Sequence, residues 1–553
     1  MASSYGLTQF EQDPELDLKA YSVWICDRVH YIRPWRPLVA WLWCEGATHG
    51  IQYGAEVNSM PETKGWQLKI IDGYVYLAVI EPKPEEVPER EKVFREKMRP
   101  ILDNYDVLWA KAMEDWNAVE NYFKEFDYEG ATDIQIYEHY EDYLVRHERA
   151  WWAIHMLWMY PVYGLYNLFV DVCADMLGLD LEDLLFKRLM SGFDNMLFRV
   201  NKAFWVLGER AGELGLADLF LTTTDNEQLM RMLEESDAGR KWLQEYREFL
   251  KVHGWRCEDT WDSSTPTFLE NPSLGLRDVK YGIAKGGAFV LDVERERLAK
   301  DREEAEREVL ARVPTEQKEW FEKLMKVAEK SGSFSEEHNY YIDYPAFGIA
   351  RRMNLEYGRR LTKAGVIDDP EDIFFLFPCE VRRAAIARDR ENLRPYVNRR
   401  REEWERNCQV TPALFLGAME KLPDVSRKDP IIRVMAGAPR VKPELKADLY
   451  GSASAPGVVE GIARVVMTDK ELHTVQPGEI LVAPITGPPW TPIFGIVSGV
   501  VCNAGGSLSH PVIVSREYGI PAVIGTMEAT QKIRTGDRIR VDGDMGAVYI
   551  LTS

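Results

Sequence analysis

The periodicity of apolar residues changes once along this chain of 553 residues, and that change limits the folds open to it. From about residue 93 to residue 408 apolar residues recur at helical spacing; Trp320, Leu324 and Ala328, for instance, fall on one stripe. After residue 447, short β-branched runs alternate with glycine and proline turns, which is typical of strands. The sequence therefore predicts a multidomain protein in which a large, mostly α-helical body precedes a compact α/β domain.

Composition places the boundaries between these parts. Residues 1–92 mix strand-like runs such as 73–80 with tryptophans and prolines, and end in an acidic, proline-rich stretch that we expect to be an exposed connection. Residues 436–447 have the proline and polar content of a linker. The predicted parts are a mixed α/β N-terminal part (1–92), a helical body (93–435), a linker (436–447) and an α/β domain (448–553).

Within the body, the runs 132–177 and 182–216 predict helices, and two further helices are expected to meet at Pro314. Residues 150–170 contain no Asp, Glu, Lys or Arg, and an uncharged stretch of this length could span a bilayer. This stretch also carries His155, Pro161 and several tyrosines and tryptophans, which favour a buried helix over membrane association.

Charge and cysteine content argue against several classes of function. With 89 acidic and 68 basic residues the net charge is −21, which disfavours nucleic-acid and membrane partners. The seven cysteines are scattered without a CxxC pair, which argues against a disulfide framework or a structural zinc site; no metal site is predicted. No secretory signal is visible, so we expect a reducing, cytoplasmic location.

The sharpest chemical signal is the segment 502–526, CNAGGSLSHPVIVSREYGIPAVIGT. A buried strand is expected to run into a glycine pair, and then into Ser507 and Ser509, either of which is able to cap the helix that follows. His510 would lie in the first turn of that helix, where backbone N–H groups and the helix dipole favour a phosphoryl group. An imidazole placed there is suited to accept and release phosphoryl groups as a nucleophile.

This segment resembles the swivelling phosphohistidine domain of the phosphoenolpyruvate-utilising enzymes, which include phosphoenolpyruvate synthase, pyruvate phosphate dikinase, rifampin phosphotransferase and phenylphosphate synthase. The resemblance covers the whole last domain, including the PWTP stretch at 489–492. It implies that His510 is the phosphorylated histidine, and that its loop comprises Gly505, Gly506, Ser507 and Ser509. Leu508 stands where the dikinase has a regulatory threonine, so control by phosphorylation at that point is not expected.

The helical body resembles, more weakly, the substrate-side domain of rifampin phosphotransferase and the large subunit of phenylphosphate synthase. The phrases KVHGWRC (251–257) and EEHNYY (336–341) carry this resemblance. Arg256 would neutralise a transferring phosphoryl group, and His338 or Glu337 would take a proton from an attacking hydroxyl. Each of these residues also has a structural reading, as a helix-end charge or a buried hydrogen-bonded group.

Fourteen of the 17 tryptophans precede residue 262, in clusters such as Trp35, Trp41 and Trp43. Such rings are able to line a pocket for a flat aromatic ligand, although core packing explains them more economically. His155, within a second aromatic cluster, is a further candidate for contact with substrate; an interior, hydrogen-bonded histidine is the alternative.

Together these resemblances imply the acceptor-side subunit of an ATP-dependent phosphotransferase. No GxxxxGK[ST] loop, ATP-grasp-like segment or pyruvate-binding barrel is recognisable, so we expect an ATP-grasp partner subunit to charge His510 with Mg²⁺. The expected acceptor is the hydroxyl of a small, phenol-type compound, and the expected product resembles that of phenylphosphate synthase. The alternatives are transfer to a non-aromatic alcohol or an antibiotic, and a non-catalytic phosphocarrier.

Overall fold

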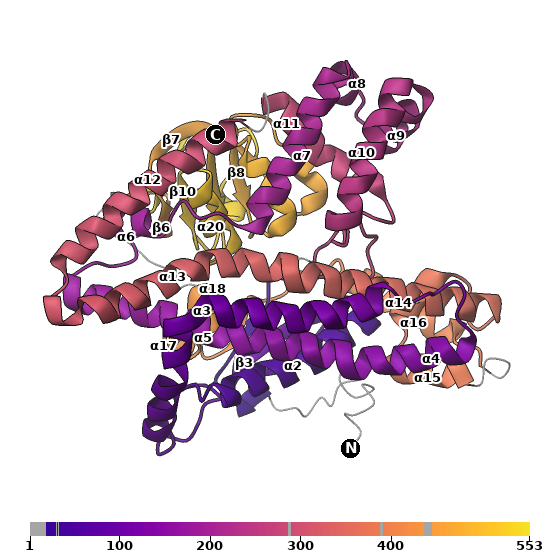
Figure 1. The fold of residues 1–553 in the computed structure, drawn as a ribbon, viewed down its shortest axis with the longest axis horizontal. Coiled ribbons are helices and arrows are strands. Elements are labelled where there is room, and N and C mark those ends of the chain that lie inside the picture. The colour runs from indigo at the N-terminus through magenta and orange to yellow at the C-terminus, as the bar shows by residue number, and fades with distance from the viewer. Residues whose placement is uncertain are drawn as a thin grey trace. The chain divides into compact units, whose positions relative to one another are not determined.

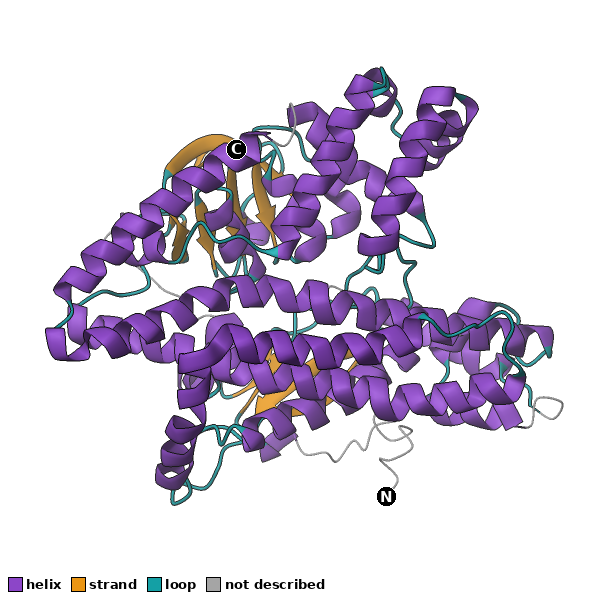
Figure 2. Ribbon diagram, in the orientation of Figure 1, coloured by secondary structure: helices purple, strands orange, loops and turns teal. Residues whose placement is uncertain are grey.

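The computed structural model describes residues 18–552 apart from 29, 31–32, 286–288, 387–390 and 436–444. Helices make up most of the described chain (Figure 2). The chain divides into two compact units built from interleaved segments. Unit 1 consists of Met1–Pro161, Arg256–Pro266 and Tyr341–Asp429, and unit 2 of Val162–Trp255, Thr267–Tyr340 and Pro430–Ser553. Most of the predicted linker, 436–444, lies outside the described residues.

Unit 1 contains a four-stranded sheet with the order β2-β3-β1-β4. Strands β2 (Trp66–Ile71) and β3 (Tyr74–Val79) form a hairpin. Asp72 and Gly73 both have positive φ at its turn, as a two-residue hairpin loop requires. Strand β1 (Val23–Cys26) pairs antiparallel with β3 and with β4 (Phe415–Gly417), which is distant in the sequence.

Helices of unit 1 pack around this sheet, and α2 (Pro37–Val57) contacts β2 directly. Helix α3 begins at Val87, inside the stretch expected to be an exposed connection. Its early proline, Pro88, lies in the first helical turn, where a missing N–H costs nothing. The other helical segments of the unit are α4 (Asp133–Asp142), η3 (Tyr143–His147), α14 (Tyr344–Lys363), η7 (Pro370–Phe375), α15 (Pro378–Ile386), α16 (Arg394–Asn407), η9 (Met419–Lys421) and α17 (Leu422–Lys428).

Helix α5 (Glu148–Leu177) contains the long uncharged stretch, and the unit boundary falls within it, after Pro161. Most of its side chains from Trp151 to Val170 are buried, as expected for a helix in a protein core. Among the described residues, no helix combines the length and the apolar character that crossing a bilayer requires. The buried-helix interpretation of this stretch is therefore supported.

Unit 2 combines helices with an eight-stranded sheet, the yellow strands in Figure 1. Two of the helices, α12 (Phe289–Arg312) and α13 (Lys318–His338), are separated at Pro314 as predicted. The predicted stripe on α13 is buried at Leu324 and Ala328, but Trp320 is 42% exposed, whereas its neighbour Phe321 is buried. Further helical segments of the unit are α6 (Leu184–Leu189), α7 (Met196–Glu213), α8 (Ala217–Thr222), α9 (Asn226–Glu235), α10 (Asp237–His253), η4 (Pro272–Gly275), α11 (Leu276–Lys285), η5 (Thr315–Gln317), α18 (Pro430–Met435), η11 (Asp469–Thr474), η12 (Pro488–Trp490), α19 (Thr491–Phe494) and α21 (Ala529–Lys532).

The eight-stranded sheet has the order β5-β12-β11-β7-β8-β9-β10-β6. Its centre, β7 to β10, is parallel, and antiparallel strands flank it on both sides. Helix α20 (His510–Glu517) connects β9 to β10. The strands are β5 (Leu449–Tyr450), β6 (Ser452–Ala455), β7 (Val458–Val465), β8 (Ile480–Ala483), β9 (Gly499–Cys502), β10 (Ala522–Ile524), β11 (Arg538–Asp542) and β12 (Ala547–Thr552).

Candidate active site

A glycine-dependent turn brings the chain from β9 to the start of α20. Gly505 has a φ of +136°, a conformation that favours glycine. A Cβ on Gly505 would lie 2.7 Å from both Ile524 Cγ2 and Ser509 Oγ. The turn therefore excludes a side chain at this position, both by its backbone conformation and by its packing.

His510 lies in the first turn of α20, as predicted, and is its first residue, but the start of the helix is not capped as expected. Ser509 occupies the N-cap position, yet its hydroxyl donates to Gly506 O at 2.8 Å. The N–H groups of Val512 and Ile513 donate to Ser509 O, and Pro511 has no N–H. The start of α20 thus keeps its dipole, but offers a phosphoryl group fewer backbone donors than predicted.

Two threonine hydroxyls bracket the imidazole of His510. Thr486 Oγ1 lies 2.9 Å from Nδ1, and Thr491 Oγ1 lies 3.0 Å from Nε2. Thr491 donates its only hydroxyl proton to Pro488 O at 2.8 Å, so it accepts from Nε2–H. In the neutral ring, Nδ1 then accepts from the Thr486 hydroxyl. The network assigns His510 to the Nε2–H tautomer, with the ring lone pair on Nδ1.

Burial keeps this imidazole neutral. His510 is only 7% exposed, and the ring of Phe494 meets it edge-on with centroids 5.6 Å apart. Burial lowers the pKa of His510 to about 3, because a low-dielectric environment disfavours the imidazolium. A nucleophile must be unprotonated, so the histidine is in the reactive protonation state at neutral pH.

Arg516, on the same helix, holds the loop from the other side. Its Nε donates to Ser454 O on β6 at 2.8 Å, and its Nη1 donates to Ser507 O at 3.4 Å. Arg516 and Thr486 were not predicted as site residues. Thr491 belongs to the PWTP stretch of the family resemblance, which was the available signal for it.

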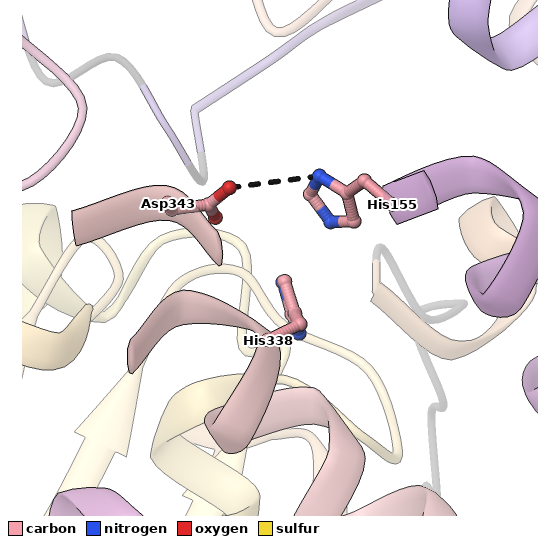
Figure 3. A group of neighbouring side chains, drawn as sticks. All are labelled: His155, His338 and Asp343. Atoms are coloured by element: carbon pink, nitrogen blue, oxygen red, sulfur yellow. Dashed lines mark ion pairs between the residues drawn. The ribbon is translucent and has the colours of Figure 1, made fainter. Parts of the chain in front are cut away.

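Two candidates of the helical body, His155 and Arg256, belong to unit 1. His155 Nδ1 lies 3.5 Å from Asp343 Oδ1, the contact dashed in Figure 3. The same carboxylate oxygen accepts from Trp151 Nε1 at 3.0 Å, and burial raises the pKa of Asp343 to about 7. The guanidinium carbon of Arg256 lies 5.9 Å from the ring centroid of Tyr344, the residue after Asp343. Asp343 was not predicted.

The other two candidates, Glu337 and His338, belong to unit 2. His338 Nδ1 donates to Phe334 O, one turn earlier on α13, at 2.9 Å. Burial raises the pKa of Glu337 to about 7, although Arg199 and Lys330 oppose that rise. The structure thus assigns the four predicted substrate-side residues to two units, and it supplies a structural role for the His338 ring.

The comparison with protein families finds two matches. Residues 475–546 match the PEP-utilising enzyme mobile domain, the segment that contains His510 and both threonines. Residues 155–336 match the fourth domain of rifampicin phosphotransferase. The eight-stranded sheet domain therefore resembles a PEP-utilising mobile domain, and part of the helical body resembles rifampicin phosphotransferase, as the sequence predicted.

Relatives with similar sequences are longer than this chain. Chondramide synthase from Chondromyces crocatus is 30% identical over 96% of the chain but only 14% of its own length. An uncharacterised phosphotransferase of Bacillus subtilis is 28% identical, over 71% of the chain and 46% of its length. A rifampicin phosphotransferase from a Streptomyces species is 30% identical, over 60% of the chain and 37% of its own length. The chain thus spans less than half the length of each of these relatives.

Proposed function

We propose that this chain is a phosphotransferase that relays a phosphoryl group through His510 to a hydroxyl acceptor. The observation that carries this proposal is a neutral, buried imidazole at the first position of a helix, in a segment that matches a PEP-utilising mobile domain. Both ring nitrogens are engaged by threonines. Phosphorylation therefore requires one of these hydrogen bonds to open and the imidazole to be exposed.

ATP is the proposed source of the phosphoryl group, transferred with Mg²⁺ by an ATP-grasp partner subunit. A phosphohistidine domain on a linker would visit the charging site and the acceptor site in turn. In the second transfer the acceptor oxygen forms a bond to phosphorus while the P–N bond breaks. The P–N electron pair stays on the ring nitrogen, which takes a proton from water to give neutral imidazole, and the hydroxyl proton passes to a base.

A phenol-type acceptor is the primary proposal. Unit 1 concentrates buried indoles, and Trp43 lies with its ring centroid 4.6 Å from Trp152 and 5.2 Å from Trp35. Flat apolar rings favour a flat apolar ligand, and phenyl phosphate would be the product. An antibiotic hydroxyl is the second candidate, because several relatives are rifampicin phosphotransferases.

The test uses the acceptor side, which requires no partner. The purified chain is mixed with phenyl phosphate and labelled phenol, and the label appearing in phenyl phosphate is measured. We expect exchange in the wild type and in His473→Ala, a matched control in the same unit, and none in His510→Ala. Intact-mass analysis should show an acid-labile adduct of about 80 Da on His510.

Two results would count against the proposal. Exchange that persists in His510→Ala would show that His510 is not the nucleophile. An adduct on His510 that no phenol, alcohol or rifamycin discharges would instead identify a phosphocarrier that serves another protein. Running the panel of hydroxyl compounds in the same assay separates the phenol and antibiotic candidates.

A further inference from the structure

Two consecutive residues at the end of α20, Glu517 and Tyr518, fasten the sheet domain to helices of unit 2. Asn201 Nδ2, on α7, donates to the hydroxyl of Tyr518. The ring of Phe198, also on α7, meets that of Tyr518 edge-on with centroids 5.9 Å apart. Tyr518 packs against the apolar core of helices α7 to α11 and against that of the sheet domain. We call Glu517 and Tyr518 the latch, because they join the helix of His510 to the helical part of the unit.

Glu517 lies against a turn between α6 and α7. Its carboxyl accepts hydrogen bonds from the backbone N–H groups of Phe193 and Gly192. Gly192 has a φ of +76°, and a Cβ there would lie 2.6 Å from the backbone of α12, so this position requires glycine. Arg302 of α12 donates from Nη1 to Ser191 O at 3.2 Å, and also to Gly192 O. The carbonyl side of the turn is thus held by Arg302, while its N–H groups serve Glu517.

A second carboxyl, from α13, lies near Glu517. Helices α13 and α20 contact each other, and Glu336 of α13 is 2% exposed, compared with 4% for Glu517. Oε2 of each carboxyl has no hydrogen-bond partner among the described residues. Two carboxylates buried at one junction repel each other and lose their hydration. The junction is therefore most stable when these groups are protonated.

The positive charges near Glu517 are bound to other oxygens. Arg302 Nε donates to Glu306 Oε1 at 3.3 Å, and Arg516 Nε donates to Ser454 O at 2.8 Å. Burial is accordingly the largest influence on Glu517 and raises its pKa to about 8, although Arg302, the turn and Arg516 oppose that rise. The other titratable groups near the latch come from separate elements of unit 2: Glu336 of α13, Tyr166 of α5 and Asp278 of α11.

Elements outside the sheet domain also cover the surroundings of His510. The N–H of Leu508 donates to Val434 O of α18 at 3.1 Å. Trp205 of α7 lies against the residue after Phe494, whose ring meets the imidazole edge-on. Separation of the sheet domain from these helices would remove both covers.

We propose that the latch is controlled by a proton: while Glu517 is protonated the sheet domain stays on the helices and His510 stays buried, and loss of that proton frees the domain. Separation returns the carboxyl to water, where it ionises at its ordinary pKa and releases one proton to solvent. The open state is therefore favoured as the pH rises from about 5 to 8. As regulation of transfer this inference rests on the proposed function, but access to His510 is measured without transfer.

The experiment measures the rate at which diethyl pyrocarbonate modifies His510, divided by the rate at the exposed His49 of the same molecule. The division corrects for the pH dependence of the reagent. In the wild type this ratio should rise roughly 10- to 100-fold from pH 6 to pH 8, because release of one proton gives at most tenfold per pH unit. Glu517→Gln should keep a low ratio at both pH values. Glu460→Gln, an exposed carboxyl on β7, is the matched control and should show the wild-type rise.

Tyr518→Phe tests the latch without changing the group that titrates. The variant lacks the hydroxyl that accepts from Asn201, so the closed state loses one hydrogen bond. The ratio should be several-fold above the wild-type value at pH 6, and it should still rise with pH. A ratio equal to that of the wild type at every pH would overturn the role of Tyr518 in holding the domain. Circular dichroism of each variant at pH 6 verifies that it is folded.

The outcomes separate this inference from the proposed function. A wild-type ratio that does not change with pH, or a rise of the wild-type size in Glu517→Gln, overturns the latch even if His510 carries phosphate. A rise that is lost in Glu336→Gln but kept in Glu517→Gln would assign the proton to the other carboxyl, and overturns it too. A latch that responds to pH as expected, in a chain that never exchanges label with phenyl phosphate, supports control of access to His510 and counts against the proposed function alone.

Discussion

The two threonines beside His510 decide which ring nitrogen carries the proton. Thr491 has already donated its proton to Pro488 O, so it acts toward the ring only as an acceptor. The hydroxyl of Thr486 then donates the hydrogen bond that the lone pair on Nδ1 accepts. A buried acceptor that loses its donor costs about 1–3 kcal/mol, so Thr486 contributes to stability as well as to orientation.

Thr486→Val keeps the shape of the side chain and removes this donor. We expect the free energy of unfolding to fall by about 1–3 kcal/mol, and the tautomer of His510 to lose its preference. Chemical denaturation measures the first effect, and long-range ¹H–¹⁵N correlation of the imidazole measures the second. Thr486→Ser, which retains the hydroxyl, should restore the Nε2–H pattern; a Val variant with unchanged ring shifts would contradict this assignment.

At the scale of elements, α20 and α13 bury two carboxyl groups within unit 2. Glu517 on α20 is 4% exposed and Glu336 on α13 is 2% exposed. Burial raises the pKa of Glu517 to about 8, which nearby Arg302 opposes. Burial also raises the pKa of Glu336, and the charge of Glu517 adds to that rise. Packing of these two helices is therefore most favourable when both carboxyls are protonated.

This arrangement predicts a pH dependence of stability. The folded-state pKa of Glu517 lies above its unfolded value, so the folded chain holds a proton that the unfolded chain releases between those two values. The free energy of unfolding must then fall as the pH rises from about 5 to 8. The Glu517→Gln variant has no ionisable group at this position. Its free energy of unfolding should therefore fall less over this pH range than that of the wild type, by an amount on the order of 1–3 kcal/mol.

Urea denaturation of the wild type and Glu517→Gln at pH 6 and pH 8 measures this difference. Glu460→Gln, an exposed carboxyl on β7, is the control and should leave the pH dependence as it is. Equal pH slopes in the wild type and Glu517→Gln would show that Glu517 does not carry a proton in the folded state.

At the scale of the whole molecule, the sheet domain that contains His510 packs against helices of unit 2. Tyr281 of α11 donates to Leu472 O at 3.0 Å, and Arg277 donates to Pro489 O at 3.3 Å. Trp205 of α7 packs so closely on Gly495 that a Cβ there would lie 2.5 Å from Cζ2 of the indole. His510 is buried in this arrangement, so the proposed transfer would require the domain to separate from these helices.

Gly495→Val introduces a side chain where the Trp205 ring leaves no room. We expect the domain to separate more often and His510 to become accessible, which diethyl pyrocarbonate modification followed by peptide mapping detects. The rate at His510 should rise several-fold. Gly212→Val on α7, where a Cβ would meet nothing within 4 Å, is the control. Equal modification of both variants would mean that this contact does not limit access to His510.

The sequence alone predicted the local features of this protein. Strand β9 spans the predicted residues 499–502, and His510 begins the predicted helix. Such features depend on neighbours within a few positions, namely β-branched runs, a glycine that tolerates positive φ, and a helix start. Helical periodicity failed at Trp320 near the start of α13: this residue follows the stripe but is exposed, because a stripe does not tell how far the core extends.

Tertiary structure decided the surroundings of the reactive groups. Thr486 precedes His510 by 24 residues, and Trp261 lies more than two hundred residues from His30, yet each contacts its histidine. No local pattern specifies such contacts, because they follow from how strands and helices pack. The pKa values of His510 and Asp343 follow from burial in the same way. The sequence therefore determined which residue types carry the chemistry, whereas packing determined their protonation, their partners and their access to solvent.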